Sequence, residues 1–469
     1  MSGLNAETYD RQYTDGYLLK RIFSYFSAHR NQLVTIVAMV TLIAVVTSIR
    51  PVVISAGIDA LELPDGSNSL PLLIFALFLT EIIEYGSNWV RRRLMSRVIG
   101  NLVSQMRKDA FAAAVHRDLA FYDRHKSGKI VSRITSDTQE FGQVILLASD
   151  IISQVVSVII LTAVLFSREW RLTLLVLVML PFIVGSAMMF RRLARIATRK
   201  GMQAMAAVND NIQETVSGIS VAKSFRQEAM IYDDFAEINA ESYKVNLRRG
   251  FVFAMIFPTL NALSGIATAI ILYVGALTVI DGSIEVGVWY LFIQGVDRFW
   301  FPFTNVAAFW SQFQQGLSAA ERVFALIDTD NTLQQTAHET VTDLHGRVEF
   351  KEVVFEYDSG ERVLDDFSLI LQPGESVAFV GHTGAGKSTI AKLIARFYEF
   401  QGGEILIDGH NIRTFNVQSY RSRLGIVPQA PFLFSGTIAD NIRYSRPNAA
   451  DEEVEAVAMS IGGGEWLET

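Results

Sequence analysis

The sequence contains no cysteine among its 469 residues. Disulfide bonds, thiolate metal sites and cysteine nucleophiles are therefore excluded together, and nothing about redox compartment follows. Charged residues are also scarce, at 19% of the chain, whereas 50% of the residues are hydrophobic. The mean hydropathy of +0.28 is too high for a soluble protein of this length, so the composition indicates a membrane protein.

The amino-terminal segment lacks the uninterrupted apolar core of a signal peptide, because Lys20, Arg21 and Arg30 divide it. We therefore expect the amino terminus to remain in the cytoplasm. Apolar and aromatic residues between these cations favour an amphipathic helix at about 17–29 that lies in the membrane interface. A frayed tail is the alternative.

Six segments contain the roughly 20 predominantly apolar residues that a helix needs to cross a bilayer. They are residues 33–58, 70–90, 144–166, 172–190, 252–280 and 286–309. The two long connections, 91–143 and 191–251, carry most of the Lys and Arg of this region, which by the positive-inside rule places them in the cytoplasm. Their helical composition predicts spans that continue as long helices beyond the bilayer. Residues 1–328 are thus expected to form a six-helix, all-α transmembrane domain.

A polar, turn-rich stretch over residues 329–345 predicts a linker to a soluble domain at 346–469. Within that domain, Gly374–Val380 predicts a buried strand and Ser388–Phe397 an apolar-faced helix. Between them, residues 381–389 read Gly-His-Thr-Gly-Ala-Gly-Lys-Ser-Thr. A glycine-rich loop at a strand-to-helix turn predicts a phosphate-binding site.

The residue types of this loop suit phosphate chemistry. Glycines let backbone N–H groups close around phosphate oxygens, and the helix N-terminus adds partial positive charge. Lys387 is expected to reach the β and γ phosphates, and Ser388 to ligate Mg²⁺. The loop therefore predicts ATP and Mg²⁺ as ligands, with contacts from Gly381, Thr383, Gly384, Ala385, Gly386, Lys387, Ser388 and Thr389.

Ordered motifs over the whole chain resemble a type IV ATP-binding cassette (ABC) exporter half-transporter, the class of bacterial multidrug and lipid exporters. Besides the phosphate loop, they comprise Pro51, Ile58-Asp59, Phe121–Gly128, Gly218, Lys223, Phe225, Arg322–Asp328, Arg396–Tyr398, Gly403–Gly409, Val427–Gln429 and Leu433–Ile438. The resemblance implies a multi-domain membrane protein in which the transmembrane domain precedes an α/β P-loop ATPase domain.

The resemblance also implies roles for individual residues. Tyr357 matches the aromatic residue that stacks on adenine, and Gln429 matches the glutamine that touches Mg²⁺ and the attacking water. Phe121–Arg124 and Ser217–Ser224 match the two coupling helices through which closure of the ATPase domains moves the spans.

Partners and location follow from the same resemblance. It implies a second half-transporter, as a homodimer or a heterodimer, and a multi-pass location in the cytoplasmic (inner) membrane with the ATPase domain in the cytoplasm. The expected cargo is a hydrophobic or amphipathic small molecule or lipid, in contact with membrane lipid, and no nucleic acid is expected as a partner.

The sequence after Ser388 lacks an acidic motif of four apolar residues followed by Asp-Glu. The nearest imitation is Ile405–Asp408, which follows the loop too closely, and we expect Asp408 in a hairpin turn ahead of Gly409. Gly462–Glu465 imitates the family's signature motif but predicts a loop between helices. These 469 residues thus predict a partial ATPase domain, with Gln429 but no complete catalytic set, and weak or no turnover.

Charged residues inside the spans are candidates for function, namely Glu81, Glu84, Asp150, Asp297 and Arg298. Glu81 and Glu84 share a helix face, where they would line a cavity for a cationic or polar cargo, make interhelical hydrogen bonds or lie near the headgroups. Aromatic residues of the last span suit a cavity wall, although lipid-facing packing is favoured because aromatics occur on its other faces too.

An ATP-driven exporter protomer is the leading interpretation. A non-hydrolysing regulatory or receptor-like subunit that pairs with a complete cassette protein is the alternative. A membrane-anchored kinase is not supported, because no acceptor or catalytic acid motif follows the phosphate loop.

Overall fold

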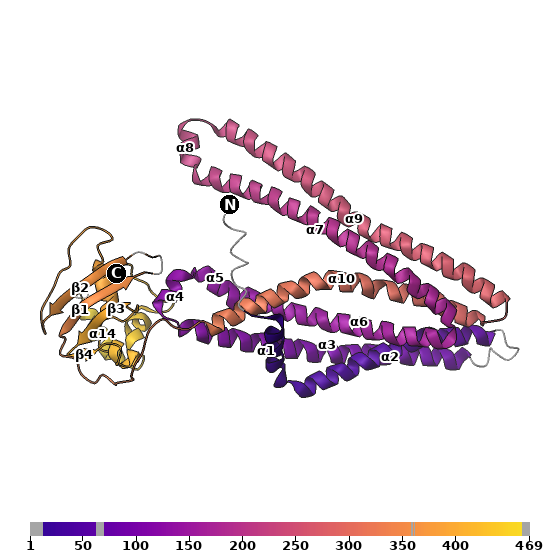
Figure 1. The fold of residues 1–469 in the computed structure, drawn as a ribbon, viewed down its shortest axis with the longest axis horizontal. Coiled ribbons are helices and arrows are strands. Elements are labelled where there is room, and N and C mark those ends of the chain that lie inside the picture. Colours follow the sequence, from indigo (N-terminus) through magenta and orange to yellow (C-terminus); the bar gives the residue numbers. More distant parts are fainter. Residues whose placement is uncertain (1–12, 62–69, 358–359, 361, 462–469) are drawn as a thin grey trace. The chain divides into compact units, whose positions relative to one another are not determined.

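A computed structural model describes residues 13–61, 70–357, 360 and 362–461. The chain forms two compact units (Figure 1). Residues 1–117 and 125–330 make the first, and residues 118–124 and 331–469 make the second.

The first unit is helical. It consists of α1 (Asp15–Ser27), α2 (Arg30–Leu61), α3 (Leu70–Val115), α5 (Ser127–Ser132), the π-helical η2 (Arg133–Asp137), α6 (Thr138–Arg168), α7 (Trp170–Ser217), α8 (Ile219–Ser224), α9 (Glu228–Ile280) and α10 (Val286–Asp328). At about 1.5 Å per residue, α9 with its 53 residues is about 80 Å long. The longest helices therefore extend far beyond the hydrocarbon core of a bilayer, which is about 30 Å thick.

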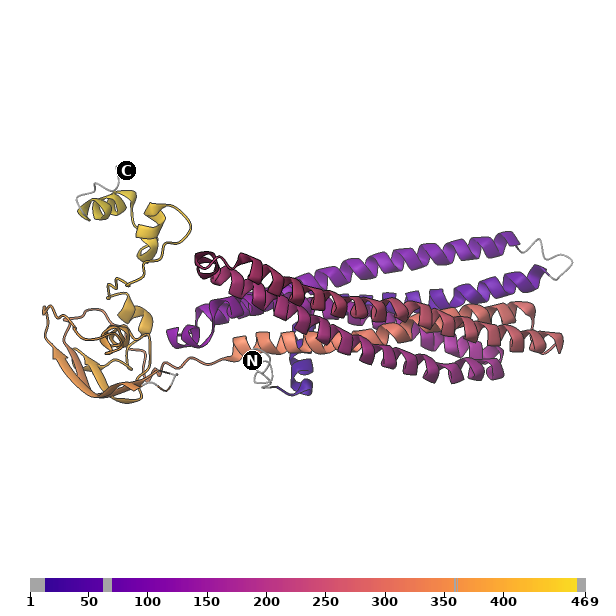
Figure 2. The same cartoon turned by 90° about the horizontal axis from the view of Figure 1, so that it is seen from above.

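Two groups of helices make up this unit. Helices α2, α3, α6 and α10 pack on one another, and Figure 2 shows them running along one common direction. Helices α7 and α9 pack against each other as a hairpin closed by α8, and Figure 1 shows this hairpin diverging from the other helices toward α8. The tip of the hairpin is thereby left without cover from the rest of its own unit.

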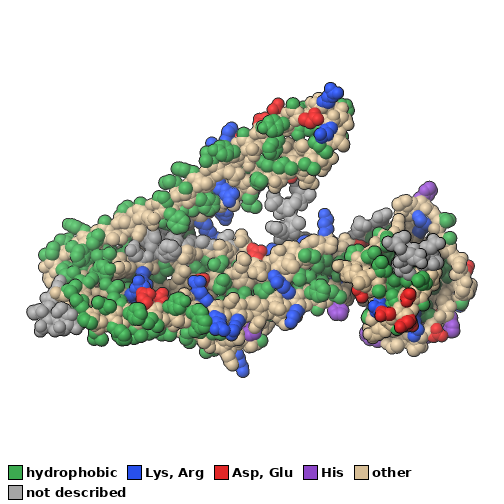
Figure 3. All heavy atoms as spheres, turned by 180° about the vertical axis from the view of Figure 1, so that it is seen from behind, with side chains coloured by type: hydrophobic (Ala, Val, Ile, Leu, Met, Phe, Trp, Pro, Cys, Tyr) green, Lys and Arg blue, Asp and Glu red, His purple; other side chains and the backbone are tan. Residues whose placement is uncertain are grey.

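Five described helical segments are long and apolar enough to cross a membrane. They are Arg30–Leu61, Leu70–Val115, Ser127–Arg168, Trp170–Ser217 and Glu228–Ile280, and each contains one predicted span. Figure 3 shows hydrophobic side chains spread over the surface of this unit, as expected where the surroundings are lipid. The sixth predicted span, 286–309, falls in α10, whose described apolar stretch Val286–Val296 is shorter, so the count of six stays a prediction.

Charged side chains fix the carboxyl end of α10. Asp328 accepts hydrogen bonds from Tyr13 Oη at 2.6 Å and from Arg21 Nη2 at 2.7 Å. One turn and a half earlier, Arg322 donates to both carboxylate oxygens of Asp137 in η2, at 2.9 and 2.7 Å. The Arg21 guanidinium holds the pKa of Asp328 below its ordinary value. These contacts tie α1 and η2 to the helix that leads into the second unit.

The second unit contains an antiparallel four-stranded sheet in the order β2-β1-β3-β4. Its elements are α4 (Leu119–Arg124), β1 (Val348–Glu356), β2 (Arg362–Leu371), α11 (Lys387–Ile394), β3 (Gly402–Ile407), β4 (His410–Asn411), α12 (Val417–Arg421), α13 (Ile438–Ile442), η3 (Arg443–Ser445) and α14 (Asp451–Ser460). One face of the sheet packs its alternate side chains, such as Phe355 and Ile405, against Leu393 of α11 and Tyr420 of α12.

Local turn signals produce the β3–β4 hairpin. Asp408 and Gly409 both adopt left-handed backbone angles, with φ of 51° and 86°, as a two-residue hairpin turn requires. The Asp408 carboxylate accepts the N–H groups of His345, Gly346 and Arg347 at 2.8, 3.3 and 2.9 Å. The prediction of Asp408 as a turn residue is confirmed, and its carboxylate also secures the segment that leads into β1.

The predicted buried strand Gly374–Val380 is wrong for this structure. Its residues are irregular, and the side chains of Val377 and Val380 are 43% and 90% exposed. A strand is stabilised by ladder hydrogen bonds to a neighbour, and no described segment pairs with this one. Residues 424–436 are likewise irregular, with Val427 97% exposed. The described part of this domain therefore has an antiparallel sheet with helices, and the predicted loop at 462–465 lies outside the described residues.

Candidate functional site

The phosphate loop precedes α11 in the second unit. Gly384 and Gly386 adopt φ of 90° and 82°, a left-handed region that glycine occupies without strain. A Cβ on Gly386 would lie 2.9 Å from Val363 Cγ1, so close packing also favours glycine there. The predicted helix begins at Lys387, and the loop therefore ends at a helix N-terminus.

Lys387 directs its charge into the loop. Its Nζ donates hydrogen bonds to the carbonyl oxygens of Gly381 and His382, at 2.8 and 2.7 Å. Ser388 is exposed on the first turn of α11, whereas Thr389 is buried. A cation inside a loop of backbone groups, with an exposed hydroxyl beside it, is an arrangement suited to a polyphosphate and its metal ion.

Tyr357 follows β1 and contacts the loop's helix. Its hydroxyl lies 3.1 Å from Thr389 Oγ1. Its ring packs edge-on against Phe355, with 4.8 Å between centroids, and against Tyr398, with 5.4 Å between centroids. Lys392 Nζ lies 6.0 Å from the Tyr357 ring centroid. The side chain predicted to stack on adenine is thus held between the sheet and α11.

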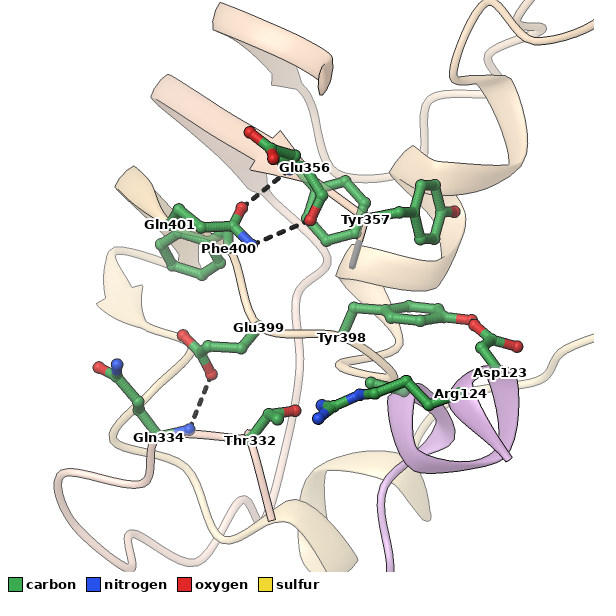
Figure 4. A pocket seen from close by; sticks show the side chains of 12 residues that line it. Asp123, Arg124, Thr332, Gln334, Glu356, Tyr357, Tyr398, Glu399, Phe400 and Gln401 are labelled. Atoms are coloured by element: carbon green, nitrogen blue, oxygen red, sulfur yellow. Dashed lines mark hydrogen bonds between the residues drawn. The ribbon is translucent and has the colours of Figure 1, made fainter. Parts of the chain in front are cut away.

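A cavity of about 750 Å³ lies beside Tyr357 (Figure 4). The described residues that line it are Ala120, Asp123, Arg124, Thr332, Gln334, Phe355, Glu356, Tyr357, Tyr398, Glu399, Phe400 and Gln401. Its walls are braced by the Gln401 side chain, which bonds to Glu356 N and O at 2.9 and 3.0 Å, and by Glu399, which accepts from Gln334 N at 2.9 Å. No residue of the phosphate loop is among those that line this cavity.

Helix α4 forms one wall of the cavity and belongs to the second unit. Ala120 packs in the same apolar core as Phe355, and Phe121 is buried. Asp118 accepts the N–H of Phe121 at 3.1 Å and both the N–H and the hydroxyl of Thr332 at 2.5 Å. Burial raises the pKa of Asp118, but these hydrogen bonds outweigh burial, and its pKa lies below the ordinary value. The predicted coupling segment is therefore built into the core of the ATPase unit.

Tyr398 joins α4 to Tyr357. It is buried, its hydroxyl donates to Asp123 of α4, and its ring contacts Tyr357 edge-on (Figure 4). Burial, together with this hydrogen bond, raises the pKa of Tyr398. The sequence showed Tyr398 within a family motif, but only the folded chain reveals its partners, because Asp123 lies 275 residues away.

Several other residues predicted to act at the site or in coupling are exposed in the structure. Gln429 is exposed in the irregular stretch after α12, and its side chain makes no hydrogen bond within the described part of the chain. The second coupling segment, α8, closes the α7–α9 hairpin, and the neighbouring Phe225 is 71% exposed. The predicted roles of both segments stay predictions.

Comparison with known proteins matches both parts of the chain. The family model described as "ABC transporter transmembrane region" matches residues 33–296, and that described as "ABC transporter" matches residues 364–469. The chain is 33% identical to exp8 of Streptococcus pneumoniae, named as an ABC transporter ATP-binding protein, over 96% of this chain and 77% of the relative.

Two further relatives carry names that state a cargo. A fatty acid ABC transporter ATP-binding/permease protein of Mycobacterium bovis is 31% identical over 85% of this chain and 62% of the relative. An ATP-dependent lipid A-core flippase of Syntrophus aciditrophicus is 26% identical over 96% of this chain and 75% of the relative. The long apolar helices and these matches together indicate a multi-pass membrane protein with an ABC-type ATPase domain. The chain belongs to the ABC transporter family, as a half-transporter of the exporter type.

Proposed function

We propose that this chain is one protomer of an ATP-driven exporter of hydrophobic or amphipathic molecules. The observation that carries the proposal is the position of α4. This helix lies between α3 and α5 of the membrane unit in sequence, yet it packs in the ATPase core and contacts Tyr398, the neighbour of Tyr357. A segment shared in this way suits transmission of nucleotide binding to membrane helices.

The phosphate-loop unit supplies the ATP site. Tyr357 offers its ring to adenine, the loop from Gly381 to Ala385 offers backbone N–H groups, and Lys387 offers its charge. Gly386 permits the close turn of the loop. The remaining proposed contacts to ATP and Mg²⁺ come from Ser388, Thr389 and Gln429. Mg²⁺, held by Ser388 and Gln429, would neutralise charge on the transferring phosphoryl group. The Lys387 ammonium already inside the loop supports this assignment.

Nucleotide binding is proposed to act on α4 through two aromatic rings. Adenine on Tyr357 would restrain that ring, which contacts Tyr398, and Tyr398 donates a hydrogen bond to Asp123. The same Tyr357 hydroxyl lies next to Thr389 on the phosphate-loop helix. The path therefore consists of direct contacts from the loop to the coupling segment.

A second half-transporter is the proposed partner, identical or different. The tip of the α7–α9 hairpin exposes Val216, Val221, Phe225, Met230 and Tyr232, each at least 58% exposed. In a cytoplasmic extension these side chains would face water, and apolar surfaces of this kind mark interaction sites. Docking of the hairpin tip onto a partner's ATPase domain would cover them.

Hydrolysis is proposed to need more than residues 1–469 contain. These residues supply the phosphate loop, Tyr357 and Gln429, but after Ser388 they contain no signature motif and no Asp-Glu pair that follows four apolar residues. Without a carboxylate to polarise water, turnover loses a major electrostatic contribution. The non-hydrolysing subunit hypothesis makes the same prediction for these residues alone.

ATP hydrolysis tests the exporter proposal. The protein expressed from its gene, in lipid nanodiscs, should hydrolyse ATP faster when amphiphiles such as dodecanoate are added. The Lys387→Ala variant should lose both the basal and the stimulated rate. If hydrolysis in the wild type equals that of Lys387→Ala at every amphiphile concentration, the exporter proposal fails and the non-hydrolysing subunit is favoured.

A further inference from the structure

A polar pocket lies inside the helical unit. Its volume is about 320 Å³, and it is lined by residues of α2, α6 and α10, which all fall within predicted spans. Its polar residues include Thr47, Ser157, Gln154 and Arg298, while Ile43 and Leu161 contribute apolar wall. Polar and charged groups at membrane depth are costly and often mark functional cavities, so this pocket is a candidate binding site.

The hydroxyl groups of the pocket already donate to their own helices. Ser48 Oγ donates to Ala44 O at 2.7 Å, Thr47 Oγ1 donates to the same oxygen at 3.1 Å, and Ser157 Oγ donates to Ser153 O at 3.0 Å. These side chains therefore present oxygen lone pairs rather than hydrogens. Donors for an anion must come from other residues.

Two side chains supply those donors. Asn305 Nδ2 donates to Gln154 Oε1 at 3.1 Å, which orients the amide and leaves Gln154 Nε2 as a donor. The Arg298 guanidinium makes no ion pair or hydrogen bond within the described residues, although it lines the pocket. An arginine fork and an amide N–H that line one pocket suit a carboxylate, which can accept hydrogen bonds from both.

Nearby charges set how much negative charge the pocket tolerates. Among the side chains that the structure describes, Arg50, Glu84 and Glu81 are the charged groups that act on Arg298. Glu81 forms an ion pair with Arg50 at 2.6 Å, and neither glutamate lines the pocket. Glu84 thus offsets part of the charge of Arg298 from outside the pocket. Arg50 and Arg298 balance Glu81 and Glu84 before a ligand binds, so a doubly charged headgroup would leave twice the excess negative charge of a single carboxylate in this apolar region.

We propose that this pocket binds the carboxylate headgroup of a single-chain amphiphile. The carboxylate oxygens accept from Arg298 and Gln154 Nε2, and the alkyl chain lies along Ile43 and Leu161. The site assigns carboxylate amphiphiles as the cargo class of the proposed exporter. Its role in transport rests on the proposed exporter function. Binding itself requires no ATP and can be measured separately.

Equilibrium binding of radiolabelled dodecanoate to the full chain in phosphatidylcholine nanodiscs tests the proposal. We expect saturable binding that weakens about tenfold or more in Arg298→Gln, the loss expected for a charge-assisted pair of hydrogen bonds. Arg298→Lys should restore part of the affinity. Arg171→Gln, which changes an arginine stacked on Trp170 away from the pocket, is the matched control and should bind like the wild type.

Probes with the same chain length separate headgroup recognition from partition into lipid. Dodecanol and dodecylamine should bind at least tenfold more weakly than dodecanoate, with no dependence on Arg298, and dodecyl phosphate should bind more weakly as well. The proposal is overturned if Arg298→Gln binds dodecanoate normally while retaining the wild-type thermal unfolding curve. It is also overturned if dodecylamine or dodecyl phosphate binds as tightly as dodecanoate, or if phosphatidylglycerol displaces dodecanoate mole for mole. Normal dodecanoate binding in a protein that shows no ATP-dependent transport would refute the exporter function and leave this site standing.

Discussion

Replacing Tyr398 by phenylalanine tests the connection between α4 and the ATPase core. The change removes one hydroxyl and leaves the ring contacts with Tyr357 and Phe355 in place. The lost bond is one to a carboxylate, worth about 1.5–3 kcal/mol when both partners are shielded. Asp123 is exposed, so water replaces part of that bond, and we expect a loss of about 1 kcal/mol.

The effect should appear locally in α4. A loss of about 1 kcal/mol corresponds to an increase of roughly fivefold in the opening equilibrium. Hydrogen exchange measured by mass spectrometry should therefore be faster for the amides of residues 119–124 in Tyr398→Phe, with little change in β1 or β3. Asp123→Ala should give a similar increase, and the double variant should give little more than either single change.

The pH dependence supplies an independent check. Burial and the bond to Asp123 raise the pKa of Tyr398 in the folded chain. A raised pKa means that this stabilisation is fully present below the unfolded pKa of about 10 and is lost as the pH rises above it. Alkaline destabilisation of α4 should thus be weaker in Tyr398→Phe. Unchanged exchange in α4, or additive effects in the double variant, would refute the proposed connection.

Two further substitutions test the local structure of the second unit. Asp408→Ala removes the acceptor for three N–H groups and should lower the free energy of unfolding by about 1 kcal/mol, because the carboxylate is partly hydrated. Burial raises the pKa of Asp408, but the hydrogen bonds to its carboxylate outweigh burial and lower the pKa below its ordinary value. The stabilisation is therefore present above the unfolded pKa of about 4 and is lost as the pH falls. Asp365→Ala, at an exposed position, is the control and should show neither effect in urea titrations. Gly386→Ala places a Cβ 2.9 Å from Val363 Cγ1 at a φ of 82° and should abolish detectable binding of a fluorescent ATP analogue. Gly425→Ala, where the added Cβ meets open space, is the control and should bind the analogue normally. Equal binding by both variants would contradict the assigned loop geometry.

Features set by local sequence could be predicted well. The helix after the phosphate loop and the Asp408 turn follow from apolar periodicity and glycine placement within a few residues. The long helices carry continuous helical composition and apolar stretches, so each of the first five predicted spans falls within a described helix.

Features set by distant partners could not be predicted. Gly374–Val380 has the composition of a buried strand, but strand formation depends on a neighbour that no described residue provides. The bond of Tyr398 to Asp123 of α4 and the pairing of Glu81 of α3 with Arg50 of α2 each join separate segments of the chain. No pattern along one segment specifies them. The cation that lines the intramembrane pocket, Arg298, appeared in the sequence only as one charged residue among several.

Uptake into inside-out membrane vesicles tests the central claim most directly. Vesicles from cells that express the protein from its gene, together with a second half-transporter where the pair is a heterodimer, should accumulate radiolabelled dodecanoate or another amphiphile when ATP and Mg²⁺ are present outside. Accumulation should disappear with Lys387→Ala, although that variant reaches the membrane in equal amount. Uptake that is the same with and without ATP, or that persists unchanged in Lys387→Ala, would contradict ATP-driven export.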